Sequence, residues 1–376
     1  MNNVIETIKM LRKESVLNID QNNNNRYRVV VKEKDGTKTA YYFAVPIYNN
    51  ETNEMVSLSF KHTPKGYIAV GSSSLISIAQ TVRIETKDGF CQMPLIDTLI
   101  EDAFERLKYK DVTLYPTTNG ITYKSKPNSM GIYSFELECS IPFLNVKANA
   151  KSFSLLRERH QPFVTVSCIG SVDEKGNVVA PAKLTYSKIN DRKYKISISS
   201  SENSLGALFE INMYESKLIQ DTTVESNNPN DNNAFGSVSF LGNTPQLGEQ
   251  WLYSRFDLSN ITGWLDKKIL QANWYIPKYN SVNIDVSAYR VISHFCSFGS
   301  NWDNKVGFSY KIGDIVNDKE YAILNITKMF KEFQNQIGVR PHGFVLKPKN
   351  KNNNGCNIVS TADSYYMPQV FSIHYE

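Results

Sequence analysis

Short segments of strand-forming residues, separated by turn signals, recur along almost the whole chain and constrain the fold more than any other feature. In residues 27–45, YRVVVKEKDGTKTAYYFAV, apolar segments lie on both sides of Asp35-Gly36, a pair that tolerates the positive φ of a tight hairpin turn. Similar turn pairs follow at Asp88-Gly89, Asn119-Gly120 and Asn190-Asp191. This pattern predicts a series of antiparallel hairpins.

The length and composition of the chain favour several β-domains. The 376 residues are enough for at least two hydrophobic cores, and 12% of them are aromatic, including 21 Tyr and 19 Phe. The apolar runs are short and rich in Val, Ile, Thr and Tyr, which suit a pleated surface. We therefore expect an all-β fold of tandem antiparallel β-sandwiches, jelly-roll-like, with a few short helices.

Two segments have helical instead of strand periodicity. Near the N-terminus, Val4, Ile5, Ile8 and Leu11 have the spacing of a short amphipathic helix, which either packs on its own domain or acts as an assembly arm. The segment DTLIEDAFERLK (97–108) places its apolar residues on one helical face and begins with a capping Asp. The pattern predicts a helix in each place.

A change of composition between Glu215 and Phe235 marks the edge of a domain. The stretch VESNNPNDNNAFG has too few apolar residues to be buried, so it is either a linker or a long loop. We favour a loop, because KLIQDTTV (217–224) directly before it has the pattern of a strand. The expected division is an N-terminal β-rich domain, residues 1–215, of one or two subdomains, and a C-terminal β-sandwich, residues 216–376.

The C-terminal part contains an ordered set of motifs that resembles the DNRLRE-domain family. After DTTVESNNPNDNNAFGSVSFLGN (221–243), the similar segments are WLYSRFDLSNI (251–261), KKILQANWYIP (267–277), VNIDVSAYRVI (282–292), GSNWDNKVGF (299–308), AILNITKMFKEF (322–333), HGFVLKPKN (342–350) and STADSYYMPQVFSIHYE (360–376). The chain departs from the family pattern at Trp274, Asn301, Asp303 and Asn325. Residues 1–215 show no such resemblance.

The resemblance implies a β-sandwich similar to carbohydrate-binding modules and common in surface-associated bacterial proteins. Sugar contacts vary between members of the family, so the resemblance assigns no binding residue here. Trp251 and Trp264 are our candidates for glycan contact, because an exposed indole ring stacks on a sugar. Trp274 and Trp302 are expected in the core.

The sequence contains no motif of a known catalytic or metal-binding class. The five histidines, His62, His160, His294, His342 and His374, occur singly, and GxSxG, GxxxxGK[ST] and HExxH patterns are absent. We therefore expect that the protein is not an enzyme and binds no cofactor. A structural Ca²⁺ at Asp221, Asp231 or Asp257 is conceivable, but a structural turn explains these acids better.

The cysteines and the charge give no sign of a special partner. The wide spacing of the five cysteines favours the reduced state, and one long-range disulfide is the alternative. The cysteines are Cys91, Cys139, Cys168, Cys296 and Cys356. The net charge of +5 is dispersed, so no nucleic-acid partner is indicated. The densest basic stretch, KPKNKNNNG with Lys347, Lys349 and Lys351, is expected to be a solvated loop.

These observations favour a binding or assembly role. Neither a signal peptide nor a membrane span is visible, so we expect synthesis in the cytoplasm and a final place on an extracellular or particle surface. The first hypothesis is a structural or adhesive subunit of a bacterial or phage surface assembly, such as a spore surface layer, appendage or tail-like particle. It would form a homo-oligomer or filament through exposed strand edges. The alternative is a carbohydrate-binding module protein that recognises a cell-surface glycan.

Overall fold

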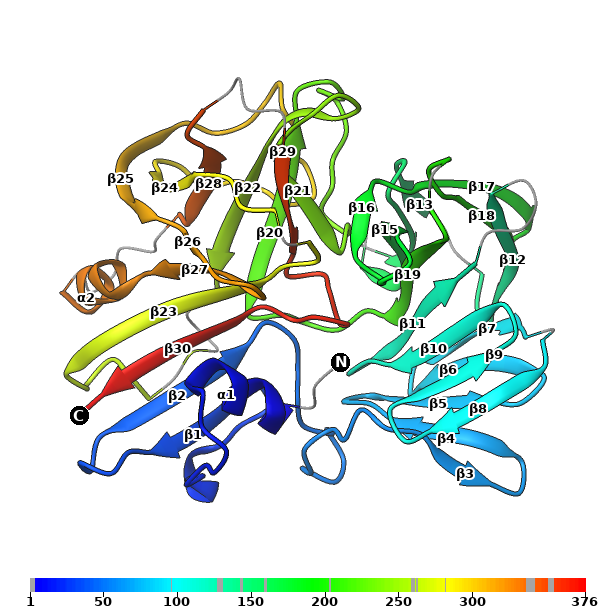
Figure 1. Cartoon of the computed structure of the whole chain (residues 1–376), viewed down its shortest axis with the longest axis horizontal. Helices are drawn as coiled ribbons and strands as arrows, with labels where there is room; N and C mark the ends of the chain where they lie inside the picture. Colours follow the sequence, from blue (N-terminus) through cyan, green and yellow to red (C-terminus); the bar gives the residue numbers. More distant parts are fainter. Residues whose placement is uncertain are drawn as a thin grey trace. The chain divides into compact units, whose positions relative to one another are not determined.

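The computed structural model (Figure 1) describes residues 4–95, 97–126, 131–142, 145–158, 161–202, 204–257, 261, 263–280, 282–335, 342–350 and 355–376. About 53% of the chain is in strands and 6% is helical, in four antiparallel sheets and two α-helices. The expected all-β sandwich architecture is confirmed. Neither α-helix is long and apolar enough to cross a membrane.

The chain divides into two compact units. Unit 1 contains Pro46–Glu215 and Phe235–Ser237, together with the described Val4. Unit 2 contains Ile5–Val45, Ser216–Ala234 and Val238–Glu376. The main part of unit 1 ends at Glu215, where the composition of the sequence changes.

Unit 1 is built from two large sheets. The strands of the first are β8 (Leu99–Ala103), β9 (Arg106–Tyr109), β10 (Val112–Pro116), β11 (Gly120–Ser125), β13 (Asn145–Ala148), β14 (Ser152–Leu156), β15 (Pro162–Val172), β16 (Val178–Ala180) and β19 (Gly206–Met213), in the order β13-β14-β15-β19-β11-β10-β9-β8 with β16 beside β15. The strands of the second are β3 (Lys61–Thr63), β4 (Gly66–Val70), β5 (Ser74–Ile78), β6 (Thr81–Thr86), β7 (Gly89–Pro94), β12 (Ile132–Cys139), β17 (Lys183–Asn190) and β18 (Lys193–Ser199), in the order β17-β18-β12-β7-β6-β5-β4-β3.

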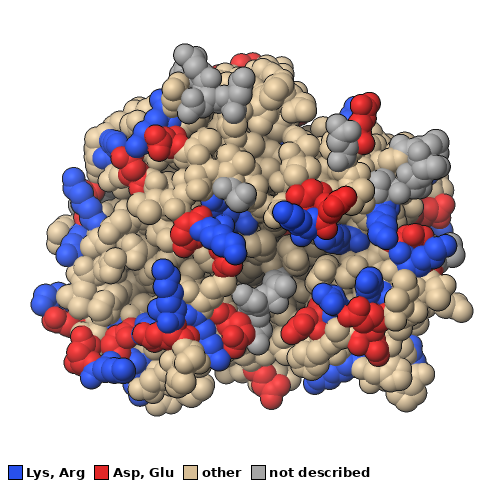
Figure 2. Space-filling model, viewed as in Figure 1, with Lys and Arg blue, Asp and Glu red and all other residues tan. Residues whose placement is uncertain are grey.

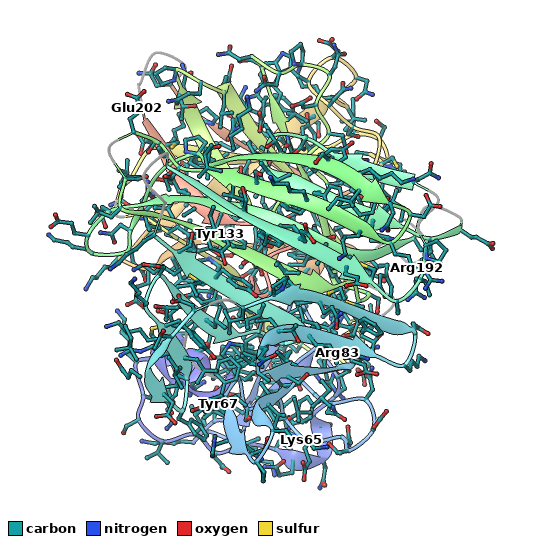
Figure 3. All side chains as sticks on the ribbon, turned by 90° about the vertical axis from the view of Figure 1, so that its right-hand side faces the viewer. Lys65, Tyr67, Arg83, Tyr133, Arg192 and Glu202 are labelled. Atoms are coloured by element: carbon teal, nitrogen blue, oxygen red, sulfur yellow. The ribbon has the colours of Figure 1, made fainter. Side chains whose placement is uncertain are left out.

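One hydrophobic core joins the two sheets of unit 1. Leu114 and Phe209 from the first sheet belong to the same buried cluster as Ile84 and Leu137 from the second. The alternation along β6 shows why the chain folds this way, since Val82 and Ile84 are buried while Arg83 lies outside, over the ring of Phe90. In Figure 3, which faces unit 1, the labelled Arg83 marks β6 and Arg192 marks the turn between β17 and β18.

The helix expected over residues 97–108 is wrong, because the segment forms the hairpin β8–β9. Leu107 is buried and pairs with Leu114 of β10, whereas Ile100 and Phe104 are 61% and 65% exposed. The apolar residues therefore do not share one buried face. Pairing with the open edge of β10 satisfies backbone groups and buries Leu107 and Tyr109, and this outweighs the local helical pattern.

Unit 2 also has two sheets. The first contains β1 (Arg28–Lys32), β2 (Lys38–Phe43), β23 (Ile269–Pro277), β26 (Val316–Asn317), β27 (Tyr321–Asn325) and β30 (Val370–Tyr375), in the order β1-β2-β30-β23-β27-β26. The second contains β20 (Ile219–Glu225), β21 (Val238–Thr244), β22 (Gly248–Phe256), β24 (Val286–Val291), β25 (Phe308–Asp314), β28 (Phe344–Pro348) and β29 (Gly355–Ser360), in the order β25-β24-β28-β22-β21-β29 with β20 beside β22. The helices are α1 (Val4–Arg12), the 3₁₀ turn η1 (Gln21–Asn23) and α2 (Thr327–Asn335).

The N-terminal hairpin belongs to unit 2 instead of the N-terminal domain in which the sequence placed it. The β1–β2 hairpin turns at Asp35-Gly36 as predicted, with Gly36 at φ +88°. Strand β2 then pairs with β30 along its whole length, and Tyr42 stacks on Phe371 with ring centroids 4.9 Å apart. Figure 1 shows this hairpin in blue beside the red β30. The first strands of the chain thus complete the sheet that its last strand enters.

The predicted N-terminal helix is present as α1, and part of its apolar face is buried. Val4 and Ile8 are buried, and the Arg12 guanidinium donates to both carboxylate oxygens of Glu33 at 2.7 and 2.8 Å. The hydrogen bonds from Arg12 hold the pKa of Glu33 below its usual value. These contacts support the packed alternative over a free assembly arm.

Candidate functional site

A cluster of aromatic rings and lysines lies on the outer face of the seven-stranded sheet in unit 2. On the inner face, Leu252 of β22, Leu346 of β28 and Ala288 of β24 belong to the main core. The neighbouring residues along these strands face outward because side chains alternate. We call the outward group the Trp251 patch; its members are Trp251, Tyr289, Trp302, Lys305, Phe308 and Lys347.

Two loops pack against the patch and fix it in place, and Trp251 shares a small core with Phe295 of one of these loops. Phe295 and Tyr253 belong to a small second core under the loop that joins β24 to β25, and the Tyr253 hydroxyl donates to the Val306 carbonyl at 2.8 Å. The Asn232 amide donates to the carbonyls of Ser297 and Ser300 at 2.7 and 2.6 Å. The Asn-rich loop and the loop that carries Trp302 are therefore joined to each other.

The two lysines of the patch lie over aromatic rings. The Lys347 ammonium is 4.7 Å from the ring centroid of Trp251 and 4.9 Å from that of Phe308. The Lys305 ammonium is 4.1 Å from the Trp302 centroid and 5.5 Å from that of Trp251. The two indole rings are 5.1 Å apart. Each ammonium thus gains a cation–π interaction, which holds it above the sheet.

One lysine of the patch, Lys347, has no ionic partner among the described residues. The Trp251 indole donates to a Glu249 carboxylate oxygen at 2.8 Å, and Lys305 donates to the Trp302 carbonyl at 2.6 Å. In the part of the chain that the structure describes, Lys347 forms no ion pair, and its ammonium lies over the rings of Trp251, Tyr289 and Phe308. A half-buried cation of this kind is a donor for an incoming anionic group.

The four tryptophans do not all lie where the sequence placed them. Trp274 is buried, as expected, but Trp264 is only 1% exposed, so its selection as a surface residue is wrong. Trp302, expected in the core, is half-exposed. Trp251 is 8% exposed and supports the patch from below. Both indoles selected as surface residues, Trp251 and Trp264, are therefore buried, and the more accessible Trp302 was taken for a core residue.

The basic stretch KPKNKNNNG, which begins at Lys347, also differs from the expectation. Lys347 was placed in a solvated loop, but it lies within β28 and is half-buried over the rings of the patch. Lys349 is exposed and forms an ion pair with Asp314 at 3.2 Å. Lys351 lies outside the described residues. On the face of the molecule in Figure 2, basic and acidic side chains are interspersed, in keeping with the dispersed charge of the sequence.

The acids considered for a calcium site have other roles where the structure describes them. Asp221 is buried, and its carboxyl group accepts a hydrogen bond from the Ala362 amide at 2.6 Å. Burial, followed by the nearby Asp363 charge, raises the pKa of Asp221 well above its usual value. The backbone amide of Asp231 takes part in a local turn. The backbone amide of Asp257 donates to the Leu218 carbonyl at 2.7 Å. Among the described residues, no three His, Cys, Asp or Glu side chains gather in a way that could hold a metal ion.

The histidines that the structure describes are separate from the patch. His374 is hydrogen-bonded to the Thr37 hydroxyl at 2.7 Å, and His62 packs against the Tyr67 ring. His294 contacts Arg255, and burial, together with this positive charge, lowers its pKa. His160 is outside the described residues.

A second lysine-rich surface occurs in unit 1. Lys108, Lys110, Lys124 and Lys126 line a groove of about 400 Å³ beside β9, β10 and β11. The register places Thr113 opposite both Lys108 and Lys124, so these two lysines lie in one cross-strand row. Acidic residues Asp111, Asp173 and Glu174 also line the groove, and they reduce its net positive charge. The Trp251 patch, which adds aromatic rings to its cations, is the better-defined candidate.

Comparison with known proteins yields no matching family model and no matching curated protein. What the chain itself defines is a class, an all-β protein of two compact units with an aromatic and cationic surface patch. The resemblance of residues 216–376 to the DNRLRE-domain family stays a prediction.

Proposed function

We propose that this chain is a non-catalytic adhesive subunit of a bacterial or phage surface assembly, a spore surface layer, appendage or tail-like particle, and that it attaches through the Trp251 patch to an acidic glycan. The observation that carries the proposal is the Lys347 ammonium, held over the Trp251 and Phe308 rings without an anionic partner in the described part of the chain.

The chemistry of the patch suits a sugar that bears an acid. Sites for small ligands combine apolar or aromatic surface with a few fixed polar groups. In this proposal the partly exposed part of the Trp302 ring packs against the apolar side of a sugar ring, and the Lys347 ammonium donates to a carboxylate, sulfate or phosphate. The resemblance to a family that is similar to carbohydrate-binding modules supports the same class of ligand.

A glycan array with neutral and acidic saccharides tests this proposal. We expect the wild-type protein to bind acidic saccharides, and Lys347→Met to weaken binding at least tenfold, because a hydrogen bond to a charged group contributes about 1.5–3 kcal/mol. Trp302→Ala should weaken binding by a similar factor through the loss of stacking. Lys349→Met is the matched control, since Lys349 lies on the same segment but is ion-paired with Asp314.

Two results would contradict the proposal. One is equal retention of the wild-type and Lys347→Met proteins on every saccharide that binds. The other is binding to single-stranded nucleic acid alone, which would assign the patch to a different partner.

Assembly through a strand edge is a second candidate, and strand β17 favours it. β17 is the last strand of its sheet, and only Leu184 among its residues is buried. Tyr186 and Ile189 are 46% and 48% exposed, which is unusual for apolar residues on an open edge. An edge of this kind can pair with the same edge of a second copy. Lys183 and Lys188 on the strand would limit such pairing without preventing it.

Sedimentation velocity over a range of concentrations tests the assembly function. We expect the wild-type protein to form oligomers and Ile189→Asp to shift the distribution to monomer, because a charge on a paired edge is desolvated. Val179→Asp is the control, since Val179 is 51% exposed but lies on β16, which belongs to the other sheet of unit 1. A wild-type protein that stays monomeric throughout would refute assembly of the isolated chain.

A further inference from the structure

Two cysteines of unit 1 face each other across neighbouring strands. Cys91 of β7 and Cys139, the last residue of β12, are direct partners in the register of the eight-stranded sheet. Both side chains are buried in the same core cluster. They come from segments almost fifty positions apart in the sequence, so only the sheet brings them together.

The hydrogen bonds around the two cysteines determine which type of pair they form. The amide of Ser140 donates to the carbonyl of Phe90 at 2.9 Å, one residue beyond the pair on each strand. The amide of Cys139 donates in the opposite direction, to Arg192 at 2.9 Å. Cys91 and Cys139 are therefore a non-hydrogen-bonded pair, for which the Cα atoms of antiparallel strands are about 4.5 Å apart. Disulfides span Cα separations of about 4.4–6.8 Å, so a bond fits at the short end of this range.

The other cysteines do not have such a partner. Cys91 and Cys139 are reduced thiols in this structure. Cys168 of β15 is as buried as Cys139 but lies opposite Phe209. Cys296 and Cys356 belong to unit 2, where Cys356 lies opposite Gly242.

We propose that Cys91 and Cys139 are a redox pair that closes to an intramolecular disulfide when the protein meets an oxidising small-molecule disulfide. The thiolate of one cysteine attacks the oxidant and releases one small thiol, which leaves a mixed disulfide. The second cysteine then attacks the protein sulfur and releases the second small thiol. Two protein thiols are oxidised, one disulfide is reduced, and the two thiol protons pass to the released thiolates.

The surroundings of the pair make this reaction slow in the folded protein. Burial raises the pKa of Cys91 to about 12, so the reactive thiolate is scarce near neutral pH. The Cys91 sulfur also contacts the Met213 sulfur at 3.6 Å, which closes one side of the site. Oxidation therefore proceeds through partial opening of the sheet, or during folding. Once formed, the bond encloses residues 91–139 and limits the unfolded chain.

The test uses a background that keeps only the two facing cysteines, Cys168→Ala, Cys296→Ser and Cys356→Ser. The protein is incubated with oxidised glutathione, at a urea concentration below its unfolding transition, and digested with trypsin without reduction. We expect a disulfide-linked pair of peptides, residues 88–106 with residues 125–147, and a higher unfolding midpoint that returns to its original value after reduction.

The matched control restores Cys168 and replaces Cys139 with alanine, which leaves two buried thiols that do not face each other. This variant should yield no internal link. The proposal is overturned if the parent background ends only as a glutathione adduct. It is also overturned if its two thiols remain free under conditions that oxidise the urea-unfolded chain.

Discussion

Trp264→Ala should lower the free energy of unfolding by about 3–5 kcal/mol, the range for removing a large aromatic side chain from a core. The Trp264 ring is fully enclosed, lies 5.0 Å from the Phe330 ring of α2, and donates to the Ile261 carbonyl at 2.6 Å. The Gln334 amide donates in turn to the Trp264 carbonyl at 2.9 Å. Loss of the indole would leave a cavity under α2 and weaken its attachment. Urea unfolding, followed by circular dichroism, measures the change.

Trp302→Ala is the appropriate comparison, because Trp302 is half-exposed and rests on the surface of the sheet. We expect it to cost less than about 2 kcal/mol, since its ring is only partly buried. Equal losses for the two variants would contradict the assignment of Trp264 to the core and Trp302 to the surface.

Lys217→Met should destabilise the protein by about 3–5 kcal/mol near neutral pH, as expected when one partner of a buried ion pair is removed. The Lys217 ammonium forms an ion pair with Asp363, and the side chains are only 7% and 12% exposed. The ammonium also lies 5.4 Å from the ring of Tyr365. Methionine keeps the apolar length of lysine, so the loss reports the charge. Denaturant midpoints at pH 7 measure it.

The pH dependence around this ion pair has a definite sign. Burial raises the pKa of Asp221 and Asp363 above the usual value, and in each case the positive charge of Lys217 opposes the rise. A carboxyl group with a raised folded-state pKa favours folding below its unfolded pKa, and this contribution is lost as the pH rises through the folded value. Asp221→Asn should therefore gain stability relative to wild type from acidic to neutral pH. The Lys217→Met deficit should shrink as the pH falls. Opposite trends would contradict the burial of these acids.

Local patterns predicted the strands well, and the errors come from interactions distant in sequence. The Asp35-Gly36 hairpin formed because its turn pair and the strand-forming segments on both sides of it agree. In contrast, the segment 97–108 has the apolar spacing of a helix, but it forms the hairpin β8–β9 because the edge of β10 is open for pairing. The pairing of β2 with β30 joins the two ends of the chain, and no local pattern shows such a contact.

The candidate site was only partly predictable for the same reason. Trp251 was considered because the chain has only four tryptophans, but its burial depends on loops that fold over it. Trp302 and Lys347 are separated from Trp251 by 51 and 96 positions, and the sheet order β24-β28-β22 brings Lys347 to it. The sequence of the turn that contains Asn301 and Asn304 does not indicate that this turn holds the Trp302 indole at the surface.

The most direct measurement of the central claim is a titration of the wild-type protein with a uronic-acid oligosaccharide, followed by tryptophan fluorescence at low and high salt. Ligand binding at the Trp251 patch predicts a saturable change in emission that weakens as salt increases, because the Lys347 charge is partly exposed and is screened. The absence of a saturable change, or an identical titration with Lys347→Met, would contradict it.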